Sequence, residues 1–81
     1  MTLEAFALLC RPTGYIRIVE WNDDMCEYET LMQYQLAPLY DAFSKELTDE
    51  YKHRVIDNVW TEFDIDTDEN SVLVIEVVEE N

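Results

Sequence analysis

The segment 71–78, SVLVIEVV, constrains the fold of this chain more than any other part of the sequence. It is a run of β-branched and aliphatic residues with a single charge, Glu76, which is typical of a strand. Successive side chains of a strand point to opposite faces of its sheet. One face then carries Leu73, Ile75 and Val77, and the other carries Val72, Val74, Glu76 and Val78.

A second strand is predicted over residues 15–21, because aromatic and β-branched residues follow the turn at residues 11–14, Arg-Pro-Thr-Gly. Residues 2–10 are ambiguous. Thr2 could cap a short helix that runs to Leu9, since Leu, Glu and Ala favour helices. We favour a strand, because it would give residues 15–21 a partner.

Two helices are expected between these strands and the last one. Asp24 and Glu27 form a pair that resembles a capping box, and apolar residues recur at helical spacing from Tyr28 to Leu47. Pro38 predicts a kink or a break near Leu36–Ala37. Thr48, which is followed by two acids, predicts the start of a second helix. Its buried stripe would consist of residues four apart, namely Tyr51, Val55, Val59 and Phe63.

These segments predict one α+β domain over residues 1–81, in the order β-β-α-α-β. We expect an antiparallel sheet of about three strands with the two helices packed on one face. If nothing covers the other face, Val72 and Val74 lie in an exposed apolar patch, which is typical of a dimer or partner interface. The alternative is a sheet that is covered on both faces, one of them by the N-terminal segment. Since 48% of the residues are hydrophobic, the chain is too apolar to be a disordered acidic protein.

The second strong feature is charge. Nineteen acids stand against five bases, which gives a formal net charge of −14. Residues 18–44 and residues 55–81 contain acids but no base. We predict that the partner-binding residues lie in these two stretches. They are Asp57, Glu62, Asp64, Asp66, Asp68 and Glu69, with Asp23, Asp24, Glu27 and Glu29 as a second cluster.

The segment 64–70, DIDTDEN, resembles the start of a calcium-binding loop, because acids occupy its first, third and fifth positions. The sixth position requires glycine for a sharp turn, but Glu69 occupies it. The twelfth position requires a bidentate glutamate, but Ile75 occupies it. We therefore expect a polar turn at residues 64–70 and no metal site.

No other residues form a pattern that catalysis would require. His53 is the only histidine and lies between two bases on a face that we expect to be solvated. Cys10 and Cys26 are the only cysteines and lack the paired spacing of a zinc site. A phosphate-binding loop would need several glycines, and Gly14 is the only one. We predict that the protein is not an enzyme and uses no cofactor.

The N-terminal residues MTLEAFALLC lack the features of a secretory signal, and no apolar run is long enough to cross a bilayer. We therefore expect a cytoplasmic protein with reduced thiols, in the host cytoplasm if a phage encodes it. An anionic membrane surface and nucleic acid would both repel this chain.

The acidity can be compared with that of DNA. A duplex carries one phosphate charge per ~1.7 Å of axis, so ~14 charges correspond to roughly 24 Å of duplex. A domain of this length has a diameter of roughly 30 Å. This character resembles that of the small acidic DNA-mimic inhibitors of phages, such as anti-CRISPR, anti-restriction and glycosylase-inhibitor proteins. Bacterial nuclease-immunity proteins share it. Because those proteins have many folds and no common motif, the resemblance assigns no residue.

The leading hypothesis is a non-enzymatic inhibitor that binds the basic nucleic-acid-binding site of a nuclease or another nucleic-acid-processing complex. Three alternatives remain open. The first is a small adaptor or structural protein that dimerises through an exposed sheet face. The second is a nuclease-immunity protein. The third is a domain adapted to high salt, although the aromatic and large aliphatic content argues against it.

Overall fold

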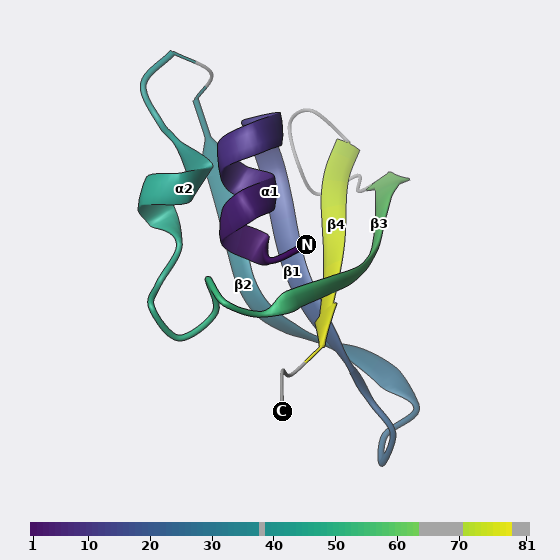
Figure 1. Ribbon diagram of the computed structural model, residues 1–81. Coiled ribbons are helices and arrows are strands. Elements are labelled where there is room, and N and C mark those ends of the chain that lie inside the picture. The colour runs from purple at the N-terminus through teal and green to yellow at the C-terminus, as the bar shows by residue number, and fades with distance from the viewer. Residues whose placement is uncertain (38, 64–70, 79–81) are drawn as a thin grey trace.

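The computed structural model describes residues 1–37, 39–63 and 71–78, which form one four-stranded mixed sheet and two helices (Figure 1). The elements are α1 (Leu3–Cys10), β1 (Gly14–Asn22), β2 (Glu27–Leu36), α2 (Phe43–Glu46), β3 (Val55–Phe63) and β4 (Ser71–Val78). The strand order is β2-β1-β4-β3. β1 pairs antiparallel with β2 and parallel with β4, and β3 pairs antiparallel with β4.

The α+β class and the strands at residues 15–21 and 72–78 are confirmed. The predicted order β-β-α-α-β is wrong, because the chain follows the order α-β-β-α-β-β. The sheet is also larger than expected and is not purely antiparallel, since β1 and β4 run in the same direction. The predicted turn at residues 64–70 lies outside the described residues.

Leu3–Cys10 form a helix with Thr2 as its N-cap, so the favoured strand is wrong and the alternative of a helix capped by Thr2 is confirmed. The Oγ1 atom of Thr2 accepts a hydrogen bond from the backbone N–H of Ala5 at 3.2 Å and caps the first turn of α1. Leu3 and Ala7 point into the core from one side of the helix. The helix ends at Arg11, which adopts the left-handed conformation with φ 43°.

Neither of the two long helices predicted between residues 24 and 63 is present. The first segment forms a hairpin turn and β2, and only Phe43–Glu46 are helical. The break predicted near Leu36–Ala37 falls where β2 ends. In the second segment, the backbone N–H groups of Tyr51 and Lys52 donate to the carbonyl of Thr48, which makes one turn, and the chain then extends as β3.

Both helices cover the same face of the sheet, although α1 lies where a strand was favoured and the two long helices predicted to pack there are absent (Figure 1). The core on this face consists of buried residues from both helices and from β1, β2 and β4. They are Leu3, Ala7, Ile16, Ile18, Leu36, Phe43, Ile75 and Val77. The alternation predicted for residues 71–78 therefore holds for Ile75 and Val77.

We call the opposite face of the sheet the open face, because neither helix covers it. Val72 and Val74 lie on this face and are only 0% and 1% exposed. The predicted exposed valine patch is therefore wrong. The alternative of a sheet covered on both faces holds at these positions, with the N-terminal segment, as α1, on the other face. The cover comes from large side chains of the sheet itself, because Tyr15 and Trp60 pack against Val19 and the two valines.

The described residues have a radius of gyration of 12.4 Å and extents of 37 × 28 × 17 Å. Within the described part of the chain, neither helix has the length and hydropathy that crossing a membrane would require. Cys10 and Cys26 are both exposed and are not bonded to each other, and the expectation of reduced thiols stays a prediction.

Candidate partner-binding surface

The hairpin formed by β1 and β2 extends beyond the pairing of β1 with β4 (Figure 1). The β1–β4 pairing ends at Val19, whereas the β1–β2 pairing continues to Asn22 and Glu27. The Oδ1 atom of Asn22 accepts hydrogen bonds from the backbone N–H groups of Asp24 and Met25, at 3.0 and 3.2 Å. These bonds make a side-chain-stabilised turn, which is a role that Asn performs well. The hairpin end is therefore an ordered projection.

Three aromatic rings form a cluster at the base of this projection. Trp21 and Tyr28 are paired across the hairpin, with ring centroids 5.0 Å apart and a T-shaped angle of 73°. Trp60, from β3, lies 5.4 Å from Tyr28 by ring centroids. Trp21 is 43% exposed and Tyr28 is 45% exposed, so much of both side chains remains accessible. We call Trp21, Tyr28 and Trp60 the aromatic cluster.

A buried carboxylate lies beside the aromatic cluster. Glu76, on β4, is only 9% exposed, and its Oε1 atom accepts a hydrogen bond from the hydroxyl of Tyr28 at 3.2 Å. Burial raises the pKa of Tyr28, and the negative charge of Glu76 and its hydrogen bond raise it further, with a smaller effect from Asp57. Among the described residues, no Lys, Arg or His forms a salt bridge with Glu76. A buried carboxylate without a cation is costly.

The hairpin also carries four of the acids that the sequence singles out, and all four are exposed. Asp23 and Asp24 lie in the turn, while Glu27 and Glu29 lie on β2 and alternate with Tyr28. The two glutamates therefore point away from the aromatic cluster. In the described part of the chain, none of the four carboxylates forms a salt bridge. We call these four residues the acidic hairpin.

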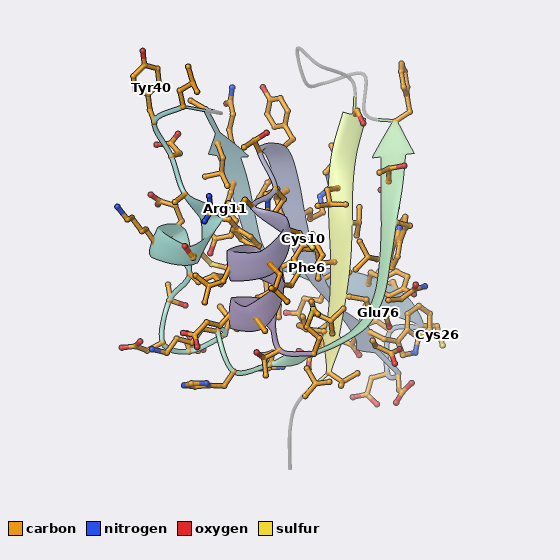
Figure 2. All side chains as sticks on the ribbon, turned by 45° about the horizontal axis from the view of Figure 1, so that its top comes forward. Phe6, Cys10, Arg11, Cys26, Tyr40 and Glu76 are labelled. Atoms are coloured by element: carbon orange, nitrogen blue, oxygen red, sulfur yellow. The ribbon has the colours of Figure 1, made fainter. Side chains whose placement is uncertain are left out.

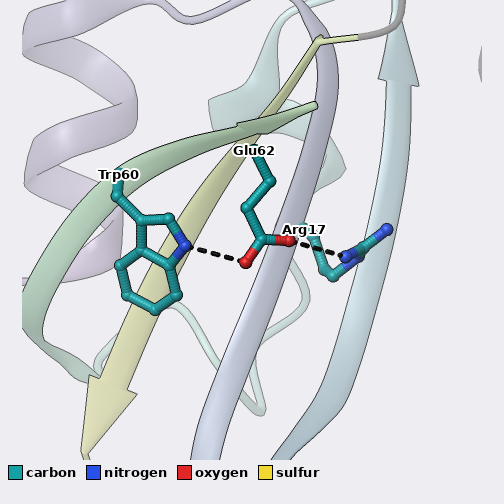
Figure 3. Close-up of polar contacts among 3 residues, drawn as sticks. All are labelled: Arg17, Trp60 and Glu62. Carbon is teal, nitrogen blue, oxygen red and sulfur yellow. Dashed lines mark hydrogen bonds and ion pairs between the residues drawn. The ribbon is translucent and has the colours of Figure 1, made fainter. Parts of the chain in front are cut away.

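The structure separates the two described acids of β3. Asp57 lies where the pairing of β3 with β4 shifts register, and it is close enough to Tyr28 to affect its pKa. Asp57 is exposed and precedes Asn58, which pairs with Glu76, so it lies on β3 near the contact between Tyr28 and Glu76. Glu62 pairs instead with Arg17, at 3.4 Å, and accepts a hydrogen bond from the indole N–H of Trp60 at 2.9 Å (Figure 3). Its charge is thus largely compensated within the molecule.

The remaining predicted acids, Asp64, Asp66, Asp68 and Glu69, lie outside the described residues. The structure thus brings together four of the ten predicted residues on the hairpin, which are Asp23, Asp24, Glu27 and Glu29, while Asp57 lies on β3. The sequence analysis missed the aromatic cluster, because it placed Tyr28 and Trp60 on helices. The available signal was a polar turn, NDDMCE, flanked by Trp21 and Tyr28, which is also typical of a hairpin.

Metal-ligand groups, a histidine in a protected position and a pocket would each point to an enzyme or a metal site. No group of three His, Cys, Asp or Glu side chains among them is placed to hold an ion, and His53 is exposed. A pocket of about 360 Å³ lies between the end of α1 and α2 and is lined in part by Arg11, Asp41 and Phe43. It contains neither a histidine nor a cysteine. The absence of an enzymatic activity stays a prediction.

The fold and this surface define a small α+β domain with a projecting acidic hairpin. No protein-family model, no curated protein and no solved structure matches the chain.

Proposed function

We propose that this protein is a non-enzymatic acidic inhibitor of the DNA-mimic type. It binds the basic nucleic-acid-binding site of a nuclease or another nucleic-acid-processing complex, as phage anti-CRISPR and anti-restriction proteins do. The observation that carries the proposal is the acidic hairpin, whose four exposed carboxylates form no salt bridge with any described base.

Two physical arguments support this proposal. A chain with a net charge of −14 is steered toward basic surfaces, which raises the rate of association. A projecting hairpin can also enter a concave site, whereas charge spread over a flat surface cannot. Asp57 adds a further carboxylate at the base of the projection.

One observation favours a second candidate, the adaptor that dimerises through its open face. The original basis for it is lost, because Val72 and Val74 are buried. The exposed rings of Trp21 and Tyr28 still offer an apolar contact on this face. Sedimentation of the purified protein distinguishes the two candidates, since the inhibitor needs no dimer and the adaptor requires one.

The test of the proposed function compares two variants with the same change in charge. Glu27→Gln/Glu29→Gln neutralises the hairpin, and Glu46→Gln/Glu50→Gln neutralises exposed acids near α2. Figures 1 and 2 show α2 and the hairpin at opposite sides of the molecule. The parent protein captures its target from a host lysate at low salt. The recovered target is then tested for release by duplex DNA and for binding to both variants.

We expect DNA to compete with the protein and high salt to weaken binding. Each exposed charge pair contributes ~0.2–1 kcal/mol, so the hairpin variant should bind about 2- to 30-fold more weakly, mainly through slower association. The α2 variant should bind nearly as well as the parent. If the target binds DNA and the protein together, and both variants bind like the parent, the acidity serves solubility and the proposal is wrong.

A further inference from the structure

Both tryptophans of the chain, Trp21 and Trp60, belong to the aromatic cluster. Within the cluster, Trp21 and Tyr28 are each more than two-fifths exposed, and Trp60 packs against the buried valines of the open face. Exposed aromatic rings next to a packed apolar surface are typical of the residues that dominate protein interfaces. The cluster therefore offers a contact that charge alone does not provide.

The charges around the cluster differ between its two sides, because carboxylates lie beside Tyr28, whereas Glu62 beside Trp60 is paired with Arg17. Glu76 accepts a hydrogen bond from the hydroxyl of Tyr28, and Asp57 is adjacent to Asn58, which pairs with Glu76 across β3 and β4. Among the residues that the structure describes, neither carboxylate has a basic partner. Aromatic faces also attract cations, through the negative potential above the ring. The rings and the carboxylates of this surface therefore both favour binding of a cation.

Elsewhere in the same molecule, one arginine contacts both an aromatic ring and a carboxylate. On the face that carries α1, the guanidinium of Arg54 lies 5.6 Å from the centre of the Tyr51 ring. One of its nitrogens, Nη1, also lies 3.0 Å from the Oε1 atom of Glu20. Arg54 thus combines a ring contact with a carboxylate contact. The Trp21–Tyr28 side of the aromatic cluster offers rings and a carboxylate of the same kinds, and among the described residues no base is paired with Glu76 or Asp57.

We propose that the aromatic cluster is the site that receives an arginine side chain of the basic partner, with the guanidinium on Trp21 and Tyr28 and within reach of Asp57. The planar guanidinium stacks on rings, is weakly hydrated and matches carboxylates with its fork of donors, so arginine is favoured over lysine. This inference rests on the proposed function, because it names the contact that this partner makes.

The experiment uses two peptides as probes, nine arginines and nine lysines, which carry the same charge. Binding is followed by the fluorescence of the protein, which reports on the cluster because it contains both tryptophans. Tyr28→Leu removes one ring of the cluster. Tyr40→Leu is its matched control, because Tyr40 is 88% exposed and lies far from Cys26 and the hairpin (Figure 2). Tyr28→Phe keeps the aromatic ring and removes only the hydroxyl, so it is the control for effects of Tyr28→Leu on folding.

We expect the arginine peptide to change the fluorescence and to bind several-fold more tightly than the lysine peptide. Tyr28→Leu should weaken the arginine peptide by about 2- to 30-fold, while Tyr28→Phe and Tyr40→Leu should bind like the parent. Where Tyr28→Leu fails to fold, Trp21→Leu provides the same test, with the indole N–H signal of Trp60 as the NMR readout. Equal binding of the two peptides, or equal losses in Tyr28→Leu and Tyr40→Leu, would overturn the inference.

The same variants separate this inference from the proposed function. Suppose that the captured target binds Tyr28→Leu as tightly as it binds the parent and yet binds Glu27→Gln/Glu29→Gln weakly. In that case the proposed function stands and the arginine site is wrong. If the arginine peptide binds the cluster but the captured target is not released by DNA, the site stands and the proposed function is wrong.

Discussion

The hydroxyl of Tyr28 and the carboxylate of Glu76 are coupled on the open face, 3.2 Å apart. Burial is the largest cause of the raised pKa of Tyr28, and the charge of Glu76 is the next. A raised pKa means that the fold favours the neutral phenol. The corresponding stability is fully present below the unfolded value of about 10 and is lost as the pH rises through the folded pKa.

The residue-scale prediction is that Glu76→Gln lowers the pKa of Tyr28 without returning it fully to about 10, because burial remains. A pH titration of tyrosine ring carbons by NMR measures this directly. Tyr34 is the internal control, since burial, Glu46 and Tyr51 raise its pKa and Glu76 does not contribute. A Tyr28 pKa that is unchanged, or a Tyr34 pKa that moves equally, would show that the carboxylate is not the cause.

At the scale of elements, β3 shows why a helix was predicted where a strand forms. Its apolar residues Val55 and Val59 are four apart, and Phe63 follows at the same interval. An interval of four fits a helical period of 3.6 and also fits a strand, where every second residue shares a face. The β-branched residues in Val55–Phe63 favoured the strand, but the cap-like Thr48 favoured the helix. Spacing alone could not decide between them.

β2 shows a different reason why a strand was not predicted from the sequence. Its pairing with β1 shifts register between Ile18 and Val19, and this shift interrupts the alternation along β2. Met32 and Leu36 pack toward the helices after the shift, while Tyr28 lies with the aromatic cluster before it. A strand with an interrupted alternation resembles a helix in sequence, because its apolar positions no longer differ by two. The bulge itself depends on the partner strand, so no local pattern predicts it.

The candidate site was predictable to a similar extent. The acids of the hairpin follow from charge alone, because they lie in a stretch without bases. The approach of Asp57 to Tyr28 does not, since it depends on β4 lying between β1 and β3 in the sheet. The compensation of Glu62 by Arg17 depends on the same strand order.

The element-scale prediction concerns the N-terminal cap of α1. Thr2→Ala removes the side-chain acceptor for the N–H of Ala5 and should lower the free energy of unfolding by about 1 kcal/mol. Urea unfolding measures it. Thr13→Ala is the matched control, because Thr13 is an exposed residue between α1 and β1, and it should change stability by less than about 0.5 kcal/mol. If both variants lose the same free energy of unfolding, the side chain of Thr2 does not stabilise α1 as a cap.

At the scale of the whole molecule, repulsion among the acids opposes folding. Three salt bridges among the described residues act against this repulsion, namely Arg17–Glu62, Lys52–Asp49 and Arg54–Glu20. Exposed pairs contribute at most about 1 kcal/mol each and are screened by salt as well. With nineteen acids against five bases, the repulsion should exceed this contribution.

We therefore expect the melting temperature to rise as sodium chloride is raised from about 0.02 to 0.5 M. The rise should be about 4–8 °C for each kcal/mol of repulsion that is screened. Differential scanning calorimetry measures it, and potassium chloride should act equally if screening is the cause. Glu27→Gln/Glu29→Gln should show a smaller rise. A melting temperature that falls with salt would mean that the ion pairs dominate over the repulsion.

The central position of β4 has a consequence for biosynthesis. β4 supplies Ile75 and Val77 to the core under the helices, and Val72 and Val74 to the open face. A nascent chain that ends before Ser71 can pair β1 with β2, but it can complete neither cluster, and β3 has no neighbour in the sheet. Contacts this distant in sequence form slowly. We therefore expect the domain to fold only after β4 has left the ribosome, and the apolar surfaces of β1 and α1 to stay accessible to chaperones until then.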